Sequence, residues 1–171
     1  MILKENLFLT GRKHVGKSTI LFSTLEKFPV ALGGFRVDRV FQGKRLRAFR
    51  IIDLDSSSSA KISTARKGGW DIHIDSFETV GAEAIKNGIR CAELIVMDEL
   101  GRFEITAYGF RQAVAEALDS TVPVIGVLKE DDNPFLNEIR SRDDTEVLEV
   151  TEENRDEVKR YVENWLSYVV A

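Results

Sequence analysis

A glycine-bounded loop near the start of the chain has the residues needed to hold a phosphate chain. The stretch from Gly11 to Ser18 reads Gly-Arg-Lys-His-Val-Gly-Lys-Ser and matches the pattern G-x-x-x-x-G-K-[ST] at every fixed position. Glycines let backbone N–H groups point inward at a phosphate, and the following helix adds the positive end of its dipole. The predicted nucleotide-binding residues are Gly11, Arg12, Lys13, His14, Val15, Gly16, Lys17, Ser18 and Thr19.

A phosphate loop works with a metal ion, and the sequence offers two ligands for one. Ser18 supplies a hydroxyl, while Lys17 is placed to bridge the β- and γ-phosphates. The second metal contact is normally an aspartate at the end of a buried strand, and Asp98 directly follows the apolar run 94–97. We therefore expect Mg²⁺ as the cofactor, held by Ser18 and Asp98.

Charged residues close to this aspartate are candidates for hydrolysis. Glu99 follows Asp98 directly, where a carboxylate can polarise a water for attack on the γ-phosphate, so we predict it as the general base. Arg102 either neutralises charge in the transition state or forms a salt bridge with Glu104 or a neighbour. Lys129 ends an apolar segment at the sheet edge where ligands bind in open α/β folds, and is a further candidate for sensing the γ-phosphate. The predicted catalytic residues are Lys17, Glu99 and Arg102.

Alternating strand and helix patterns surround these residues and predict an α/β fold with a mainly parallel central sheet. Strands are expected at residues 6–10, 92–97, 122–128 and 146–150, and a weaker one at 70–74. Residues 35–41 and 46–54 predict a β-hairpin, and Ser56 to Ser59 a mobile loop. Helices are expected at 17–28, at 77–88 with Gly88 as its end, at 108–118, at 134–140 after an Asn133 cap, and at 153–169 after a Thr151 cap.

Composition limits the possible classes of protein. The 171 residues, 43% of them hydrophobic, suit a single domain over 1–171. No apolar run approaches the ~20 residues of a membrane span, and a single cysteine, Cys91, favours a cytoplasmic protein. With a net charge of −4, any nucleic-acid binding has to be local. The alternating Arg45, Arg47 and Arg50 are either a solvated face or a patch for RNA phosphates, and the protein partner is unknown.

The chain resembles the nucleoside-triphosphatases of the THEP1 type. The likeness rests on the phosphate loop, on the hairpin after Gly34, and above all on the run from Val96 to Glu104, Val-Met-Asp-Glu-Leu-Gly-Arg-Phe-Glu. The resemblance implies a three-layer, RecA-like P-loop NTPase domain with a hairpin insertion at about 34–54. It also implies slow, Mg²⁺-dependent hydrolysis of the β–γ bond of ATP, GTP and other nucleoside triphosphates. The family's Val-Arg after Gly-Phe has Arg36 or Arg39 as its counterpart here, and Arg102 replaces a more common lysine.

Three other functions remain compatible with these residues. A GTPase is suggested by Asp98 and Gly101 in D-x-x-G, and by Lys129 and Asp131, which match [N/T]-K-x-D apart from its first residue. A kinase for a nucleotide or another small molecule would use Glu99 as a substrate contact. A nucleotide-binding regulatory module would hydrolyse only incidentally. Phosphate release with different nucleotides and acceptors separates these cases.

Overall fold

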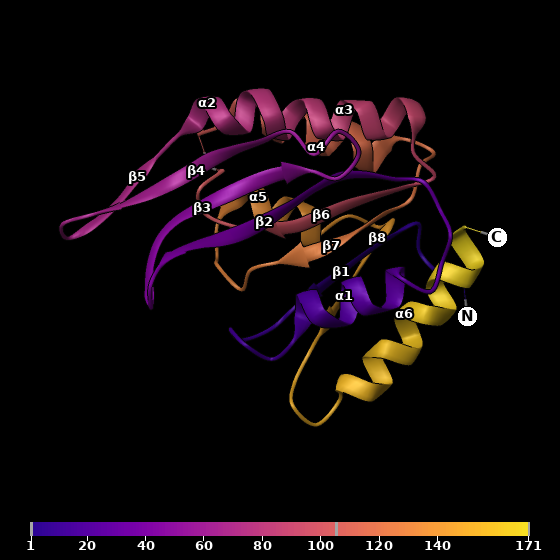
Figure 1. Ribbon diagram of the computed structural model, residues 1–171. Coiled ribbons are helices and arrows are strands. Elements are labelled where there is room, and N and C mark those ends of the chain that lie inside the picture. Colours follow the sequence, from indigo (N-terminus) through magenta and orange to yellow (C-terminus); the bar gives the residue numbers. More distant parts are fainter. Residues whose placement is uncertain (1, 105, 171) are drawn as a thin grey trace.

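Strands and helices alternate along a computed structural model that describes residues 2–104 and 106–170 (Figure 1). The strands within these residues are β1 Asn6–Thr10, β2 Leu32–Gln42, β3 Arg45–Asp53, β4 Ser59–Arg66, β5 Gly69–Ile72, β6 Leu94–Leu100, β7 Val124–Leu128 and β8 Thr145–Glu149. The helices are α1 Lys17–Leu25, α2 Ile74–Ser76, the π-helical turn η1 Phe77–Gly81, α3 Ala82–Cys91, α4 Tyr108–Asp119, α5 Pro134–Arg140 and α6 Arg155–Val169. Each of these helices is shorter than the ~20 apolar residues of a bilayer span, and none is apolar enough to form one.

One sheet holds all these strands, in the order β5-β4-β3-β2-β6-β7-β1-β8. The pairings from β2 across to β8 are parallel, and those from β2 out to β5 are antiparallel. β7 lies between β1, which precedes the phosphate loop, and β6, which carries Asp98 and Glu99. Because these strands are parallel, their carboxyl ends meet at one edge and bring the two motifs together.

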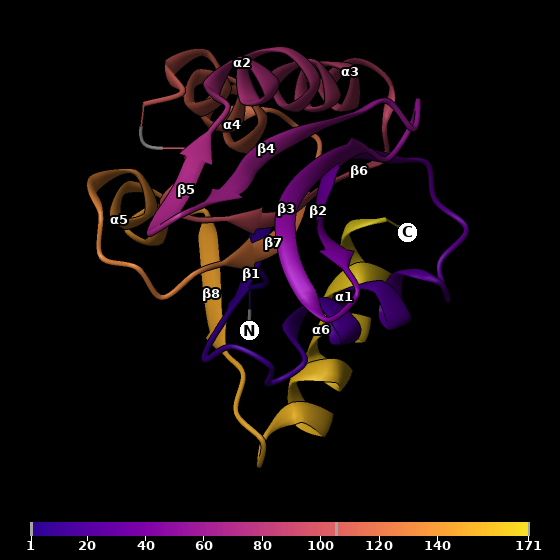
Figure 2. The ribbon, with the colours of Figure 1, turned by 60° about the vertical axis from the view of Figure 1, so that its left-hand side comes forward.

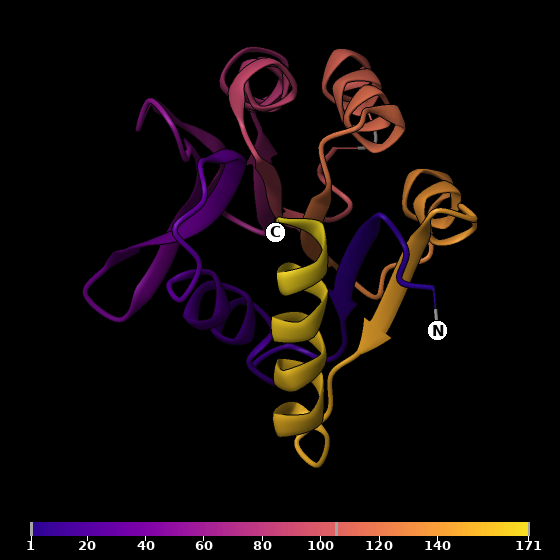
Figure 3. The ribbon, with the colours of Figure 1, turned by 90° about the vertical axis from the view of Figure 1, so that its right-hand side faces the viewer.

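Helices cover both faces of the sheet and make three layers (Figure 3). One face packs against α3, α4 and α5. In its core the ring centroid of Phe110 lies 5.5 Å from that of Phe35 and 5.3 Å from that of Phe77. The other face packs against α1 and α6, around the fully buried Trp165. The indole Nε1 of Trp165 donates to the carbonyl O of Lys4 at 2.7 Å, which satisfies its one polar group. The expected three-layer α/β architecture with a mainly parallel sheet is confirmed.

The antiparallel part of the sheet is larger than the predicted hairpin at about 34–54. β2 is longer than expected, because it pairs with β6 before it turns into the hairpin (Figure 2). β4 was not predicted at all: Ser59 begins this strand instead of lying in a loop, and small and polar residues hide its alternation. The connection before it is held by Asp53, whose carboxylate accepts the backbone N–H of Asp55 and Ser56 at 2.9 and 3.2 Å.

Gly88 does not end a helix, contrary to the prediction. Helical structure runs without a break from Ile74 to Cys91, and Gly88 is buried inside it. A Cβ on Gly33 of β2 would lie only 2.5 Å from the Cα of Gly88, so the helix and the strand touch backbone to backbone. Both glycines therefore permit close packing instead of marking an end.

Two predicted caps have different outcomes. Asn133 caps α5 as predicted, and its side chain accepts the backbone N–H of Leu136 at 2.9 Å. Thr151 does not cap α6: its hydroxyl accepts the N–H of Asn154, whose own side chain accepts the N–H of Thr151. This reciprocal pair closes a turn, and α6 begins after it, at Arg155.

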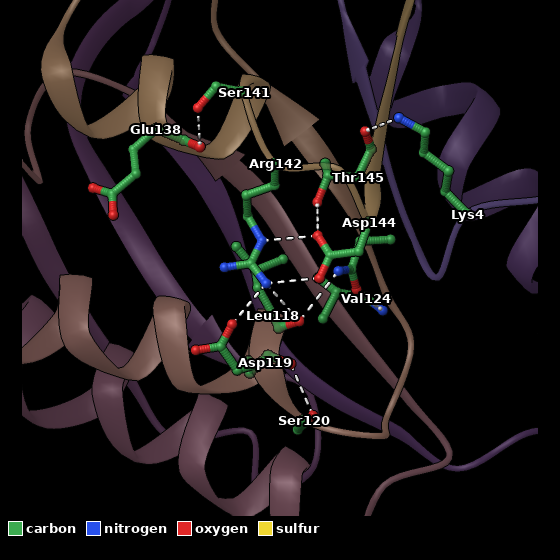
Figure 4. A network of polar contacts seen from close by, with 12 residues as sticks. Lys4, Leu118, Asp119, Ser120, Val124, Glu138, Ser141, Arg142, Asp144 and Thr145 are labelled. Carbon is green, nitrogen blue, oxygen red and sulfur yellow. Dashed lines mark hydrogen bonds and ion pairs between the residues drawn. The ribbon is translucent and has the colours of Figure 1, made fainter.

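Arg142 fastens the last part of α4 to the start of β8 (Figure 4). Its guanidinium bonds Asp144 through two nitrogens, at 2.7 and 2.9 Å, and Asp119 at 2.7 Å. It also donates to the carbonyl O of Leu118 at 3.2 Å. These carboxylates raise the pKa of Arg142, and the guanidinium lowers the pKa of Asp144. The network fixes the edge of the sheet opposite the antiparallel strands.

Candidate active site

The phosphate loop joins β1 to α1 and turns on glycines with left-handed backbones. Gly11 has φ 137° and Gly16 has φ 96°, and His14 between them also has a positive φ, 65°. At Gly11 a Cβ would lie 2.5 Å from the carbonyl O of Val150, so only glycine fits. At Gly16 there is room for a Cβ, and it is the backbone angle that favours glycine. Such a curled backbone is what a phosphate-binding loop requires.

The side chain of Lys17 folds back over this loop. Its Nζ donates to the carbonyl oxygens of Gly11, at 2.5 Å, and Arg12, at 2.8 Å. Burial lowers the pKa of Lys17, and the nearby Glu99 carboxylate opposes that shift. The ammonium group therefore stands over the concave side of the loop, where it can exchange these carbonyl partners for phosphate oxygens.

Ser18 and Asp98 meet although they are 80 residues apart. The Ser18 Oγ donates to Oδ1 of Asp98 at 3.0 Å, joining the first turn of α1 to the end of β6. Asp98 is only 5% exposed, and its burial raises its pKa to about 7, against the hydrogen bond from Ser18. A hydroxyl and a buried carboxylate are the hard oxygen ligands that suit Mg²⁺. Among the described residues no group of three or more His, Cys, Asp or Glu could hold a metal, so this pair would rely on phosphate and water oxygens for the rest.

Glu99 follows Asp98 but leaves the regular strand ladder. The pairing between β6 and β7 skips it, with Asp98 opposite Val127 and Leu100 opposite Leu128. Such an irregularity near the end of a strand changes the direction in which a side chain points. The Glu99 carboxylate is half-buried, and its Oε1 lies 3.4 Å from Nζ of Lys129. Glu99 thus faces a cation from the neighbouring strand end.

These side chains line one cleft of about 710 Å³. Its wall on the far side from the phosphate loop comes from the β2–β3 hairpin. β2 pairs with β6 only as far as Arg36 opposite Asp98, so Val37 and the residues after it project past the carboxyl edge of the parallel sheet. The lining consists of Gly11, Lys13, His14, Gly16, Lys17, Ser18, Thr19, Val37, Asp38, Arg39, Leu46, Phe49, Asp98, Glu99, Lys129, Glu130 and Asp131.

Three predicted site residues lie outside this lining. Arg12 is exposed, and Val15, 8% exposed, packs into the core beneath the loop. Arg102 lines a separate small hollow, where its guanidinium lies 5.5 Å from the centre of the Phe103 ring. It does not pair with Glu104, which is buried and accepts the backbone N–H of Gly101 at 3.0 Å. Glu104 therefore holds the turn that follows Glu99.

The apolar part of the cleft could not be predicted from the sequence. Val37, Leu46 and Phe49 line the cleft, whereas the sequence predicts them only as residues of a hairpin. Their alternation predicts strands, but no local pattern shows that the hairpin rises beside the phosphate loop.

Comparisons with known proteins agree with this arrangement. A family model described as NTPase matches residues 6–162. The chain is 29% identical over 154 residues to the nucleoside-triphosphatase THEP1 of Thermotoga maritima, covering 87% of this chain and 88% of that protein. It is 34% identical over 165 residues to THEP1 of Methanosarcina acetivorans, covering 91% and 93%. The crystal structure of THEP1 from Aquifex aeolicus superposes with a TM-score of 0.80 at 25% identity, covering 97% of this chain and 99% of that one.

Proposed function

Because this chain belongs to the family of THEP1-type nucleoside-triphosphatases, we propose that the cleft between the phosphate loop and the β2–β3 hairpin is its active site. The chain is a P-loop enzyme that hydrolyses nucleoside triphosphates. One observation carries the proposal: Lys17, Ser18, Asp98 and Glu99, from two distant segments, line the same cleft. The nucleotide's phosphate chain would lie along the loop, with its γ-phosphate toward Asp98 and Glu99.

Glu99 is the proposed general base. Its carboxylate orients a water and accepts one of its protons as the water oxygen attacks the γ-phosphorus. A bond forms from the water oxygen to phosphorus, the bond from phosphorus to the β–γ bridging oxygen breaks, and the nucleoside diphosphate leaves. Lys17 neutralises charge that develops on the β- and γ-phosphate oxygens. The half-buried position of Glu99, beside the phosphate loop and outside the strand ladder, supports this role.

Mg²⁺ is the proposed cofactor, held by the Ser18 hydroxyl and the Asp98 carboxylate. When bound, the ion would supply positive charge that stabilises the negative charge of the phosphate groups during hydrolysis. The 3.0 Å contact between the two side chains supports the pairing, since both oxygens already point at one place. Asp98 would bind in its ionised form.

Arg39 and Lys129 are proposed as further sources of positive charge at the γ-phosphate. Both line the cleft, and Lys129 lies directly beside Glu99. Arg102, the residue nominated from the sequence, has its guanidinium against Phe103 in the neighbouring hollow, and would have to leave that ring to reach the cleft. Arg39 and Lys129 need no such movement.

We propose a broad nucleotide range rather than guanine specificity. A guanine-reading lysine would have to lie against the base, away from the γ-phosphate. Lys129 instead pairs with Glu99 and lies 5.8 Å from the Phe103 ring centre, on the side of the hydrolytic chemistry.

Phosphate release from ATP, GTP, CTP and UTP, with Mg²⁺ or with EDTA, tests this function. We expect similar rates with all four nucleotides, no acceptor requirement, and loss of activity in EDTA. Activity with GTP alone would identify a GTPase, and dependence on an added acceptor would identify a kinase.

A further inference from the structure

The antiparallel strands carry a charge opposite to that of the rest of the molecule. Residues 36–71 contain nine Lys and Arg but only four Asp and Glu, a net charge of +5. The whole chain carries −4, so all other residues together carry −9. A strongly basic segment in an acidic chain creates a local positive field that the net charge conceals.

Most of these cations have no partner within the protein. Arg36 pairs with Asp38, and Arg66 with Asp71. Among the described residues, the remaining basic side chains of the segment form neither ion pairs nor hydrogen bonds, and all are exposed. We call them the ribbon cations: Arg39, Lys44, Arg45, Arg47, Arg50, Lys61 and Lys67.

The shape of this segment concentrates the charge along a narrow ribbon. The β2–β3 hairpin turns at Gly43 and Lys44, beyond the end of β6, and Figure 2 shows it curving away from the parallel strands. Arg45 pairs with Gln42, and Arg47 lies at a β-bulge where the register shifts, so the two cations lie within about 7 Å of each other along β3. Phe41, opposite Leu46 near the tip, is 55% exposed. The ribbon thus presents cations together with an uncovered aromatic ring.

We propose that the projecting tip of the β2–β3 ribbon binds single-stranded nucleic acid. Phosphate groups would contact Lys44, Arg45, Arg47 and Arg50. Phe41 shares a face with Leu46, so a base would stack on it where the strand passes over the edge of the tip. Cationic grooves with exposed aromatic rings are how proteins hold single strands without reading their sequence. The inference is independent of the hydrolytic mechanism, because these residues do not line the cleft.

A thin polyanion suits this surface better than a membrane does. A flat anionic bilayer would also meet the acidic remainder of the chain, whose charge is −9. A strand lying along the ribbon contacts only the basic segment, and charges more than ~8 Å away are largely screened at physiological salt. The inner side of the same hairpin supplies Leu46 and Phe49 to the cleft, so a bound strand would lie at its mouth.

Fluorescence anisotropy with a labelled uridine oligonucleotide of about 16 nucleotides tests the proposal. We expect binding by the full chain at low salt, with an affinity that falls as salt is raised. The triple variant Lys44→Gln, Arg45→Gln, Arg47→Gln should bind at least about tenfold more weakly. Its plot of log affinity against log salt should be shallower by about 2, since each single-strand phosphate contact contributes about 0.7.

A matched variant removes the same charge elsewhere. Lys86→Gln, Lys159→Gln, Arg160→Gln changes three basic residues on α3 and α6 and should bind like the unmodified protein. Both variants should retain basal nucleotide hydrolysis, which shows that they are folded. Equal binding by the two variants would overturn the proposal, as would absence of binding at low salt. Loss of binding on adding saturating ADP would also overturn it, because the oligonucleotide would then occupy the phosphate loop. So would binding to phosphatidylserine vesicles without binding to the oligonucleotide.

Discussion

The buried carboxyl group of Glu104 should make the stability of the fold depend on pH. The side chain is 3% exposed, and burial raises its pKa to about 7, although hydrogen bonds from the backbone N–H groups of Glu104 and Gly101 oppose the shift. In the unfolded chain a glutamate titrates near about 4.3. Between these values the folded chain binds more protons than the unfolded chain, so the free energy of unfolding falls as the pH rises. This contribution is full below about pH 4 and is lost through about pH 7.

The size of the effect follows from the difference between the two pKa values. Between the two pKa values, each pH unit changes the free energy of unfolding by ~1.4 kcal/mol. From about pH 5.5 up to the folded pKa of about 7 there are about 1.5 such units, so Glu104 should remove about 2 kcal/mol of stability between about pH 5.5 and 8.5. The variant Glu104→Gln keeps the shape of the side chain and stays neutral at every pH. It should therefore not show this loss of about 2 kcal/mol in the free energy of unfolding. Asp98, whose pKa is also raised to about 7, adds the same slope to both proteins. The difference between the two proteins therefore isolates Glu104.

Urea unfolding at these two pH values, followed by tryptophan fluorescence, measures the effect. Trp165 is fully buried and should report unfolding of the core. A loss of stability that is equal in the unmodified protein and in Glu104→Gln would refute the reasoning, because Glu104 would then be ionised in the folded chain.

Three further outcomes are expected. Lys17→Ala should abolish turnover and weaken nucleotide binding, measured by phosphate release and titration calorimetry; full activity in the folded variant would remove the loop from the mechanism. Asp98→Asn should have a defect that shrinks as Mg²⁺ is raised, and a defect indifferent to Mg²⁺ would exclude it as a ligand. Gly33→Ala should lower the free energy of unfolding, measured by urea denaturation, by about 2 kcal/mol, because its Cβ would press on Gly88. An unchanged free energy of unfolding would contradict that contact.

The phosphate loop and its neighbouring elements could be predicted because their signals are local. The loop pattern, the apolar run before Asp98, and the Asn133 cap with Pro134 each determine structure within a few residues. The prediction that the helix ends at Gly88 was wrong, because a glycine that ends a helix and a glycine that permits close packing look the same in the sequence. Only the position of Gly33 beside Gly88 distinguishes them. The packing partner is 55 residues away, where no local pattern reaches.

The composition of the cleft was harder to foresee for the same reason. Glu99 was nominated by its place next to Asp98, but its exit from the ladder depends on the register with β7. Arg102 was predicted from its position after Asp98, but its guanidinium lies against the Phe103 ring, a contact that the spacing does not show. Phe49 joins the cleft only because the hairpin rises beyond β6, which long-range pairing determines.

The most direct test of the proposed mechanism compares binding and hydrolysis in Glu99→Gln. Glutamine keeps the size of the side chain but not its basicity, so single-turnover hydrolysis should fall roughly 10²- to 10⁴-fold. Nucleotide affinity should be nearly unchanged, and Glu116→Gln, a surface change on α4, should hydrolyse normally. We expect this variant to hold its triphosphate uncleaved. Hydrolysis at the unmodified rate with normal binding would contradict it, and Glu99 would not be the base.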